Sequence, residues 1–434
     1  MASLFKSSRL EDQKYGHAFL AIDNSRALII GGQKSKNSKK SSLQLTLLED
    51  GESRDGESKM VITKDALSRL PEERSYFAAV LMQGSIYVLG GGYKGALPTS
   101  ITNSMIKLPI TLADTKKAHK NDWKECDSMV HPRLGSAAIS DGINIYVMGG
   151  KLNDGTTTNS VEMYSEELEG KNDCSKGTWK PFASMETSRA HHSAVLVEDT
   201  VYVLGGVTTN GDITNSVEYC SKNDKNQCWR KAPDLPRPLS HFSAVVVGCW
   251  IIVSGGRDGP DKDSDTDTSF VYDTRCTSSQ SWRQHSPLAL KRADHDAIVL
   301  NQSSIYMFGG STNGRVTKID FRDLTGVKQE DLEQYHKDWA QEVLKARKNG
   351  NEICSDCSTN PSSWVSFVAT PEGRPINDNI PFTSLICEEC SAIHKSIMKA
   401  HNGRIIKQIL PFSKDCKCKI ISFVCYFVTV LSIY

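Results

Sequence analysis

The chain has almost no net charge, few cysteines and no apolar leader. Its 52 basic and 51 acidic residues leave a net charge of +1, so no bulk electrostatic attraction to nucleic acid or to an anionic membrane is expected. Thirteen cysteines in 434 residues are far too few for a disulfide scaffold. Residues 1–10 lack an apolar stretch, so we expect a reducing, cytoplasmic compartment in which paired cysteines serve as metal ligands.

Catalytic motifs are also missing from the sequence. No Ser/His/Asp arrangement, phosphate-cradling loop or paired-carboxylate motif is recognisable. The pattern therefore argues against an enzyme with its own substrate turnover. A chain of this length is expected to hold two or three domains.

An apolar run that ends in a glycine doublet occurs six times in residues 14–322. Successive doublets lie between 50 and 59 residues apart, which is the scale of a four-stranded propeller blade. Each apolar run predicts a buried strand, and each doublet predicts a tight turn that side chains would block. The doublets are Gly31-Gly32, Gly90-Gly91, Gly149-Gly150, Gly205-Gly206, Gly255-Gly256 and Gly309-Gly310.

Other residue types keep the same phase as the doublets. Tryptophans precede four arginines by 8 to 10 residues, and tyrosines follow three doublets; the large rings are expected to fill the wedges between blades. We expect the arginines to pin strands and loops inside the domain. They lie 16 to 18 residues before five doublets: Arg74, Arg133, Arg189, Arg237 and Arg292.

This pattern of doublet, tyrosine and tryptophan resembles the Kelch repeat. The resemblance implies an all-β, six-bladed propeller over residues 1–325 that presents its inter-blade loops to a protein ligand. The last repeat lacks a fourth strand with tryptophan, so residues 1–10 are expected to supply it and remove the exposed edge. The charged loop that begins at Arg257 and includes Asp265 is either a docking site or merely a solvated loop.

Four C-terminal cysteines form a C-x2-C…C-x2-C set. Each close pair can place two thiolates on one turn, and two such turns complete the tetrahedral shell that zinc favours. We therefore predict a structural zinc site at Cys354, Cys357, Cys387 and Cys390. An amphipathic helix is predicted over residues 329–348, just before the set.

The sequence motifs around these cysteines resemble those of an Arf GTPase-activating domain. The shared motifs are the leading helix, C-x2-C, a Pro and Trp pair (Pro361 and Trp364), a second pair followed by His394, and a further histidine, His401. The resemblance implies a small α/β zinc-binding domain over residues 329–412. It also implies an Arf-type small GTPase as partner, which Trp364 and Arg404 would contact.

The match departs from the family at the decisive position. Lys395 stands where the family has its catalytic arginine, and lysine keeps the charge but loses the planar fork of donors. Two hypotheses remain open. The protein regulates an Arf-type GTPase by activating hydrolysis, or it is a non-catalytic Kelch adaptor whose zinc module only binds partners.

Residues 413–434 form an apolar tail. Its uncharged part, residues 420–434, is shorter than the roughly 20 residues of a spanning helix. The tail is either a membrane anchor, which would place the protein at internal membranes, or an aberrant end of the domain.

Overall fold

The structure is a computed structural model. It describes residues 7–9, 15–23, 26–33, 45–52, 58–64, 69–92, 100–110, 123–166, 177–222, 224, 228–275, 282–300, 304–310, 315–321, 364–368, 383–386 and 406–411. The chain divides into two compact units, Met1–Gly326 and Val327–Tyr434.

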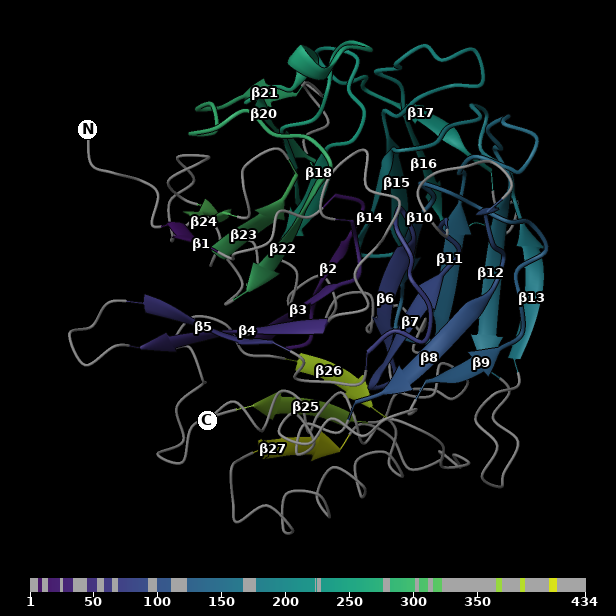
Figure 1. The fold of residues 1–434 in the computed structure, drawn as a ribbon. Helices are drawn as coiled ribbons and strands as arrows, with labels where there is room; N and C mark the ends of the chain where they lie inside the picture. The colour runs from purple at the N-terminus through teal and green to yellow at the C-terminus, as the bar shows by residue number, and fades with distance from the viewer. Residues whose placement is uncertain are drawn as a thin grey trace. The chain divides into compact units, whose positions relative to one another are not determined.

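The first unit consists of six four-stranded antiparallel sheets (Figure 1). We number the sheets along the chain, and the strands of each sheet follow in order from the inside of the unit to the outside. Sheet 1 holds β2 (Ala18–Ala21), β3 (Arg26–Ile30), β4 (Leu45–Glu52) and β5 (Ser58–Lys64). Sheet 2 holds β6 (Ala78–Met82), β7 (Ser85–Leu89), β8 (Met105–Pro109) and β9 (Lys124–Cys126). Sheet 3 holds β10 (Ala137–Ser140), β11 (Asn144–Met148), β12 (Val161–Glu166) and β13 (Gly177–Phe182).

The second half repeats this arrangement. Sheet 4 holds β14 (Ser193–Val197), β15 (Thr200–Leu204), β16 (Val217–Ser221) and β17 (Arg230–Ala232). Sheet 5 holds β18 (Ser243–Val247), β19 (Trp250–Ser254), β20 (Ser269–Asp273) and β21 (Arg283–Gln284), with the short 3-10 helix η2 (Lys262–Ser264) before β20. Sheet 6 holds β22 (His295–Leu300), β23 (Ser304–Gly309), β24 (Arg315–Asp320) and β1 (Ser7–Arg9).

The six inner strands close into a ring, which makes the unit an all-β propeller. Each of β2, β6, β10, β14, β18 and β22 contacts the inner strands of the sheets before and after it, and β22 contacts β2. The N-terminal strand completes sheet 6, because Ser8 of β1 pairs with Val316 of β24. The expectation that residues 1–10 supply the missing strand is therefore confirmed.

The apolar runs before the doublets are buried second strands, as the sequence predicted. All five residues of β7 and of β19 are buried, and so are the last four of β3 and β11. Glycine is required after these strands: the φ of Gly206 is +105°, and a Cβ there would lie 2.7 Å from the Cβ of His192. Backbone of this kind tolerates only glycine.

The tryptophans join neighbouring sheets. Trp229, at the start of the outer strand of sheet 4, donates its indole N–H to the carbonyl of Ala183, which follows sheet 3, over 2.7 Å. Trp282 makes the equivalent bond from sheet 5 to the carbonyl of Pro233 over 2.8 Å. Both rings are buried. The prediction that these residues fill the wedges between blades is confirmed.

Four of the five in-phase arginines are buried and structural. Arg133 has no exposed surface; it donates to the Gly149 carbonyl over 2.6 Å and to Glu162 over 2.7 Å. Arg189 repeats this pattern with the Gly205 carbonyl at 2.8 Å and Glu218 at 2.5 Å. Each guanidinium thus ties a glycine doublet to the third strand of its own sheet.

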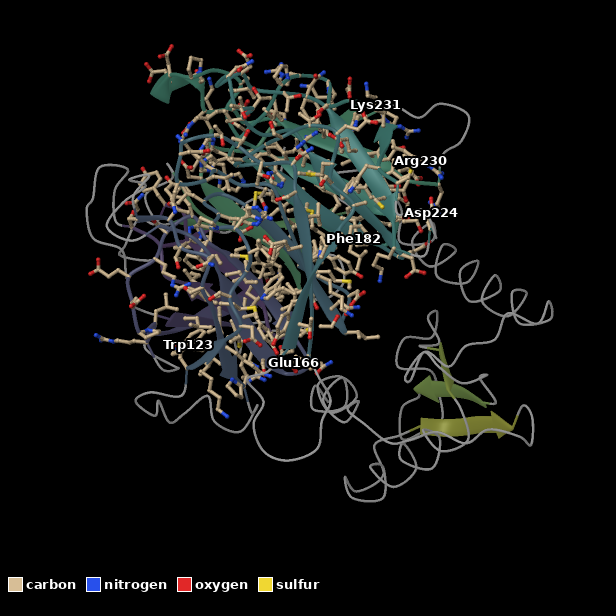
Figure 2. The ribbon with its side chains drawn as sticks, turned by 90° about the vertical axis from the view of Figure 1, so that its right-hand side faces the viewer. Trp123, Glu166, Phe182, Asp224, Arg230 and Lys231 are labelled. Carbon is tan, nitrogen blue, oxygen red and sulfur yellow. The ribbon has the colours of Figure 1, made fainter. Side chains whose placement is uncertain are left out.

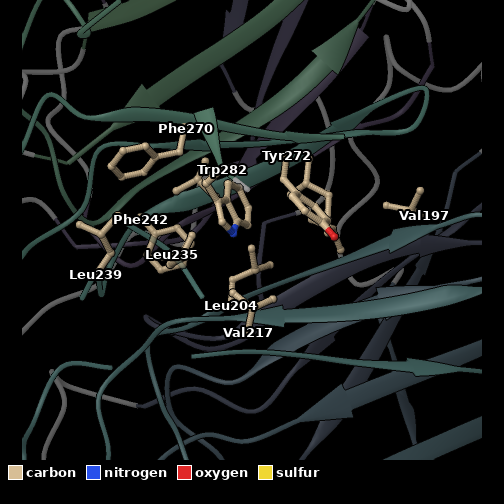
Figure 3. Packing of buried hydrophobic residues seen from close by; sticks show 12 residues of the cluster. Val197, Leu204, Val217, Leu235, Leu239, Phe242, Phe270, Tyr272 and Trp282 are labelled. Carbon is tan, nitrogen blue, oxygen red and sulfur yellow. The ribbon is translucent and has the colours of Figure 1, made fainter. Parts of the chain in front are cut away.

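The prediction for Arg237 was wrong. Arg237 is exposed and pairs with Asp258 over 3.2 Å. Leu239, two residues later, takes the buried position, because its carbonyl accepts the Gly206 amide just as the Arg189 carbonyl accepts the Gly150 amide. Leu239 belongs to the same hydrophobic cluster as Phe270 (Figure 3). Phe270 occupies the position on the third strand of sheet 5 that Glu162 occupies on the third strand of sheet 3. An apolar pair therefore replaces the ion pair in sheet 5.

The outer edge of sheet 4 carries exposed charged side chains. Arg230 and Lys231 of β17 are both exposed, and Arg230 pairs with Asp224 over 3.0 Å (Figure 2). Charged side chains on edge strands discourage pairing with other chains.

In the second unit the structure describes a three-stranded antiparallel sheet of order β26-β25-β27. The strands are β25 (Trp364–Val368), β26 (Thr383–Ile386) and β27 (Ile406–Pro411). The predicted helix over 329–348 and the apolar tail over 413–434 lie outside the described residues. Within the described ranges, no helix is long and apolar enough to cross a membrane.

Candidate functional site

The candidate site is a set of six residues at the inner end of the sheets, which we call the inner ring. Each member lies directly before or close to the start of an inner strand. Backbone hydrogen bonds run from sheet to sheet: the amide of Tyr76 donates to Gly16, that of Gly135 to Tyr76 and that of His191 to Gly135, over 2.7 to 2.8 Å. His241 and Asp294 continue the series. The inner ring is therefore Gly16, Tyr76, Gly135, His191, His241 and Asp294.

The backbone of the inner ring is left-handed at every member. The φ values of Tyr76, His191, His241 and Asp294 lie between +51° and +56°, a region that costs a residue with a side chain roughly 1–2 kcal/mol. Gly16 and Gly135 adopt the same conformation with φ of +57° and +61°. Four positions thus carry side chains where glycine would fit without strain, an outlier of the kind that motivates a functional hypothesis.

The aromatic side chains of the inner ring contact one another in chain order. The rings of Tyr76 and His191 meet edge to face at 5.3 Å between centroids, and His191 stacks on His241 at 4.1 Å with 15° between the planes. A Cβ on Gly135 would lie 2.7 Å from the ring of His191, so glycine makes room for that imidazole. Tyr76, His191 and His241 are all partly exposed, and together they form a row of flat rings.

Charged groups lie beside His241, at one end of this row. The Nε2 atom of His241 lies 3.7 Å from Asp294, and Arg257 contacts the other oxygen of the same carboxylate. Arg257 also donates to Asp265 over 2.9 Å. The charged loop singled out in the sequence therefore contributes Arg257 and Asp265 to the surroundings of the inner ring.

Burial and neighbouring charges decide the protonation of the row. Burial raises the pKa of the Tyr76 phenol, and the Asp294 carboxylate adds to this effect, so the hydroxyl remains a donor. Burial, followed by the neighbouring His241, holds the pKa of His191 well below its ordinary value. Burial opposes the charge of Arg257, but the Asp294 and Asp265 carboxylates together outweigh it, and the pKa of Arg257 is raised. At neutral pH the site therefore offers the neutral rings of Tyr76 and His191 and the firmly paired Arg257 cation.

Sequence reasoning did not single out the inner ring. The usable signal was positional: in sheets 2, 3, 4 and 6 its members stand two residues after the buried arginine. Because the residue type changes from glycine to tyrosine, histidine or aspartate, a search for repeated residue types passes over it.

A buried histidine lies next to the inner ring and yields a prediction about acid stability. Burial, with the Arg189 guanidinium second, holds the pKa of His192 well below its ordinary value. Unfolded histidine titrates near pH 6.5, so below that pH the unfolded chain binds more protons than the folded one, and stability declines as the pH falls. Phenylalanine stands at the same position in sheets 2 and 5, as Phe77 and Phe242.

We expect His192→Phe to flatten the loss of stability between about pH 6.5 and pH 5, by up to about 1.4 kcal/mol per pH unit. Chemical denaturation at a series of pH values measures this. Equal slopes for wild type and variant would contradict it.

The site residues predicted in the C-terminal region stay predictions, since all but Trp364 lie outside the described residues. Cys354, Cys357, Cys387, Cys390, Lys395 and Arg404 lie outside the described residues. Trp364 begins β25, and only its backbone is described. In the described ranges there is no group of three or more His, Cys, Asp or Glu residues that could hold a metal.

Comparison with known proteins identifies the propeller. Residues 98–310 match the model of the KLHDC2/KLHL20/DRC7 Kelch-repeats domain. No Arf GTPase-activating domain was found. A solved chain described as the structure of YjhT superposes with a TM-score of 0.55 at 14% identity, over 71% of this chain and 94% of that one, which shows a shared fold.

Curated relatives are similar over part of their length. Beta-scruin of Limulus polyphemus is 28% identical over 43% of this chain and 19% of its own. The Kelch repeat and BTB domain-containing protein 1 of Cowpox virus is 23% identical over 58% and 40%, and Kelch-like protein 40 of Xenopus laevis is 26% identical over 43% and 27%. This chain therefore spans less than half the length of each of these relatives.

Proposed function

Because the chain contains a Kelch-repeat propeller domain, we propose that it is an adaptor whose inner ring binds a partner protein. The observation that carries this proposal is the row of Tyr76, His191 and His241. Three partly exposed rings are held in a left-handed backbone conformation that glycine adopts elsewhere in the same ring. Rigid aromatic surface with hydrogen-bonding edges is the kind that dominates binding energy at protein interfaces.

The charged groups beside the row add specificity to this surface. Arg257 is held between Asp294 and Asp265, so its position is fixed before a partner arrives. A cation fixed by two carboxylates loses little side-chain freedom on binding. A partner is therefore expected to place its apolar or aromatic groups on the rings and its polar groups at the Arg257 end.

The test replaces His191 and His241 by glycine, which already stands at two positions of the inner ring. We expect His191→Gly with His241→Gly to weaken partner binding at least tenfold, because the row loses two of its three rings, while thermal stability stays close to wild type since glycine suits the backbone. Proteins captured by the full chain from an extract would be identified and their affinities measured. Lys231→Ala, on the exposed outer edge of sheet 4, is the control and should leave binding unchanged. Equal loss in both variants would contradict the assignment.

A second candidate function rests on the cysteine set of the C-terminal unit. The spacing of the cysteines and the sequence motifs around them support a structural zinc bound by Cys354, Cys357, Cys387 and Cys390. In this proposal the unit contacts an Arf-type small GTPase through Trp364 and Arg404 and activates hydrolysis. With Lys395 in place of the family's arginine, the adaptor is the better supported of the two functions.

Single-turnover GTP hydrolysis by an Arf-type GTPase tests this second candidate. We expect Lys395→Arg to accelerate hydrolysis more than wild type, since the guanidinium restores the planar donor fork, and Lys395→Ala to be inactive. The metal content of Cys387→Ser serves as a separate check and should fall by one zinc per chain. Hydrolysis that none of the variants accelerates would exclude the activator function.

A further inference from the structure

Arg292 of sheet 6 is buried without the counter-charge that Arg133 and Arg189 have. Its side chain is 2% exposed, and the hydrogen bond that it makes runs from Nη2 to the Thr317 hydroxyl over 2.8 Å. Its Nε and Nη1 atoms have no hydrogen-bond partner among the described residues. Arg133, by comparison, uses all three nitrogens and bonds to a carboxylate.

Strand register shows what is different in sheet 6. Glu162 pairs with Val147 in sheet 3, and Glu218 pairs with Val203 in sheet 4. The residue in the same register of sheet 6 is Thr317, which pairs with Met307. A hydroxyl therefore stands where the ion-paired sheets have a carboxylate, and it accepts one bond but brings no negative charge.

The acidic residues closest in sequence to Arg292 have other partners. Asp294 is held by Arg257. Asp296 accepts the Phe19 amide over 2.9 Å and the Ser243 hydroxyl over 3.3 Å. Burial lowers the pKa of Arg292 to about 10, and no carboxylate of the described residues offsets it. The guanidinium is still protonated at neutral pH, and a buried unpaired charge is strongly unfavourable.

A second buried polar side chain, His295, adjoins Arg292. A Cβ on Gly255 would lie 2.8 Å from Cε1 of His295 and 3.1 Å from Cγ of Arg292, so both side chains flank the same glycine. His295 is 6% exposed, its Nε2 lies 3.4 Å from the Ser254 hydroxyl, and its Nδ1 has no partner in the described part of the chain. Burial, followed by the Arg292 guanidinium, holds the pKa of His295 well below its ordinary value, so the imidazole is uncharged at neutral pH.

We propose that a small monovalent anion, chloride under physiological conditions, binds between Arg292 and His295 and replaces the missing carboxylate. Arg292 supplies the charge and two free N–H donors, and the neutral imidazole of His295 flanks the same glycine. The buried setting favours an ion of halide size over a larger anion. The anion would act as a structural ligand in sheet 6, which is the sheet that the N-terminal strand completes.

Thermal unfolding of the full chain in gluconate and in chloride or bromide, at constant ionic strength, tests the proposal. Gluconate is too large for such a site, so halide should raise the wild-type Tm saturably by a few degrees. Thr317→Glu places a carboxylate in the register of Glu162 and Glu218. We expect this variant to be more stable than wild type in gluconate and to lose the halide response.

Thr317→Gln is the matched control, because it has nearly the size of glutamate without its charge, and it should keep the halide response. Arg292→Met should lose the response whatever its stability. A wild-type Tm that is the same in gluconate and halide overturns the proposal. That result is expected if a carboxylate elsewhere in the chain supplies the counter-charge. A response that persists in Thr317→Glu overturns it as well.

Discussion

Arg133→Met is expected to lower the free energy of unfolding of the propeller by about 3–5 kcal/mol, whereas Arg237→Met should change it by less than about 0.5 kcal/mol. Both arginines lie at similar distances before a glycine doublet. Arg133 is fully buried and bonds to the Gly149 carbonyl and Glu162, while Arg237 is exposed. Removing Arg133 takes the buried guanidinium away from the Glu162 carboxylate, which keeps only the Val130 and His131 contacts, and most of the loss arises there.

Denaturant unfolding of the two variants measures the difference, and a double variant separates the causes. The chain itself suggests that variant, since sheet 5 has Leu239 and Phe270 in place of the pair. Arg133→Leu with Glu162→Phe should recover more than half of the loss, because it removes the unpaired charge. Recovery is incomplete because Glu162 also accepts the amide of Val130 over 2.6 Å. A single and a double variant of equal stability would show that the charge is not the cause.

Gly206→Ala is the second substitution with a large expected effect, a loss of about 3–5 kcal/mol. Its φ of +105° strains any residue with a side chain, and the new Cβ would lie 2.7 Å from the Cβ of His192 and 2.8 Å from the Ala190 carbonyl. Strain contributes about 1–2 kcal/mol and overpacking about 1–3 kcal/mol. The contacts are with backbone and with a Cβ, which cannot move aside as the end of a long side chain can.

Gly211→Ala isolates the backbone contribution in the same sheet. Gly211 has φ of +88°, but a Cβ there would meet nothing within 4 Å. We expect a loss of about 1–2 kcal/mol from strain alone. Chemical denaturation compares the two variants. Equal losses would mean that the close approach of sheet 4 to His192 can relax, contrary to the rigid packing inferred for the doublets.

The repeat was readable from the sequence because its causes are local and recur. A buried strand needs an apolar run and the turn after it needs glycine, so each doublet predicted one second strand wherever it occurred. The pairing of β1 with β24 was predictable for a related reason, because an incomplete last repeat leaves a strand edge that the N-terminus can cover. The zinc set and Lys395 remain predictions from spacing and resemblance.

The sequence by itself determined the all-β propeller, the doublets and the buried role of most in-phase arginines. Only the tertiary structure decided that Leu239 and not Arg237 is buried, since a two-residue shift in a loop is visible only through the backbone bond that it makes. The inner ring was decided there too. Its members are 50 to 60 residues apart and differ in type. They become neighbours only when the sheets close and the amide of each member after Gly16 bonds to the carbonyl of the one before.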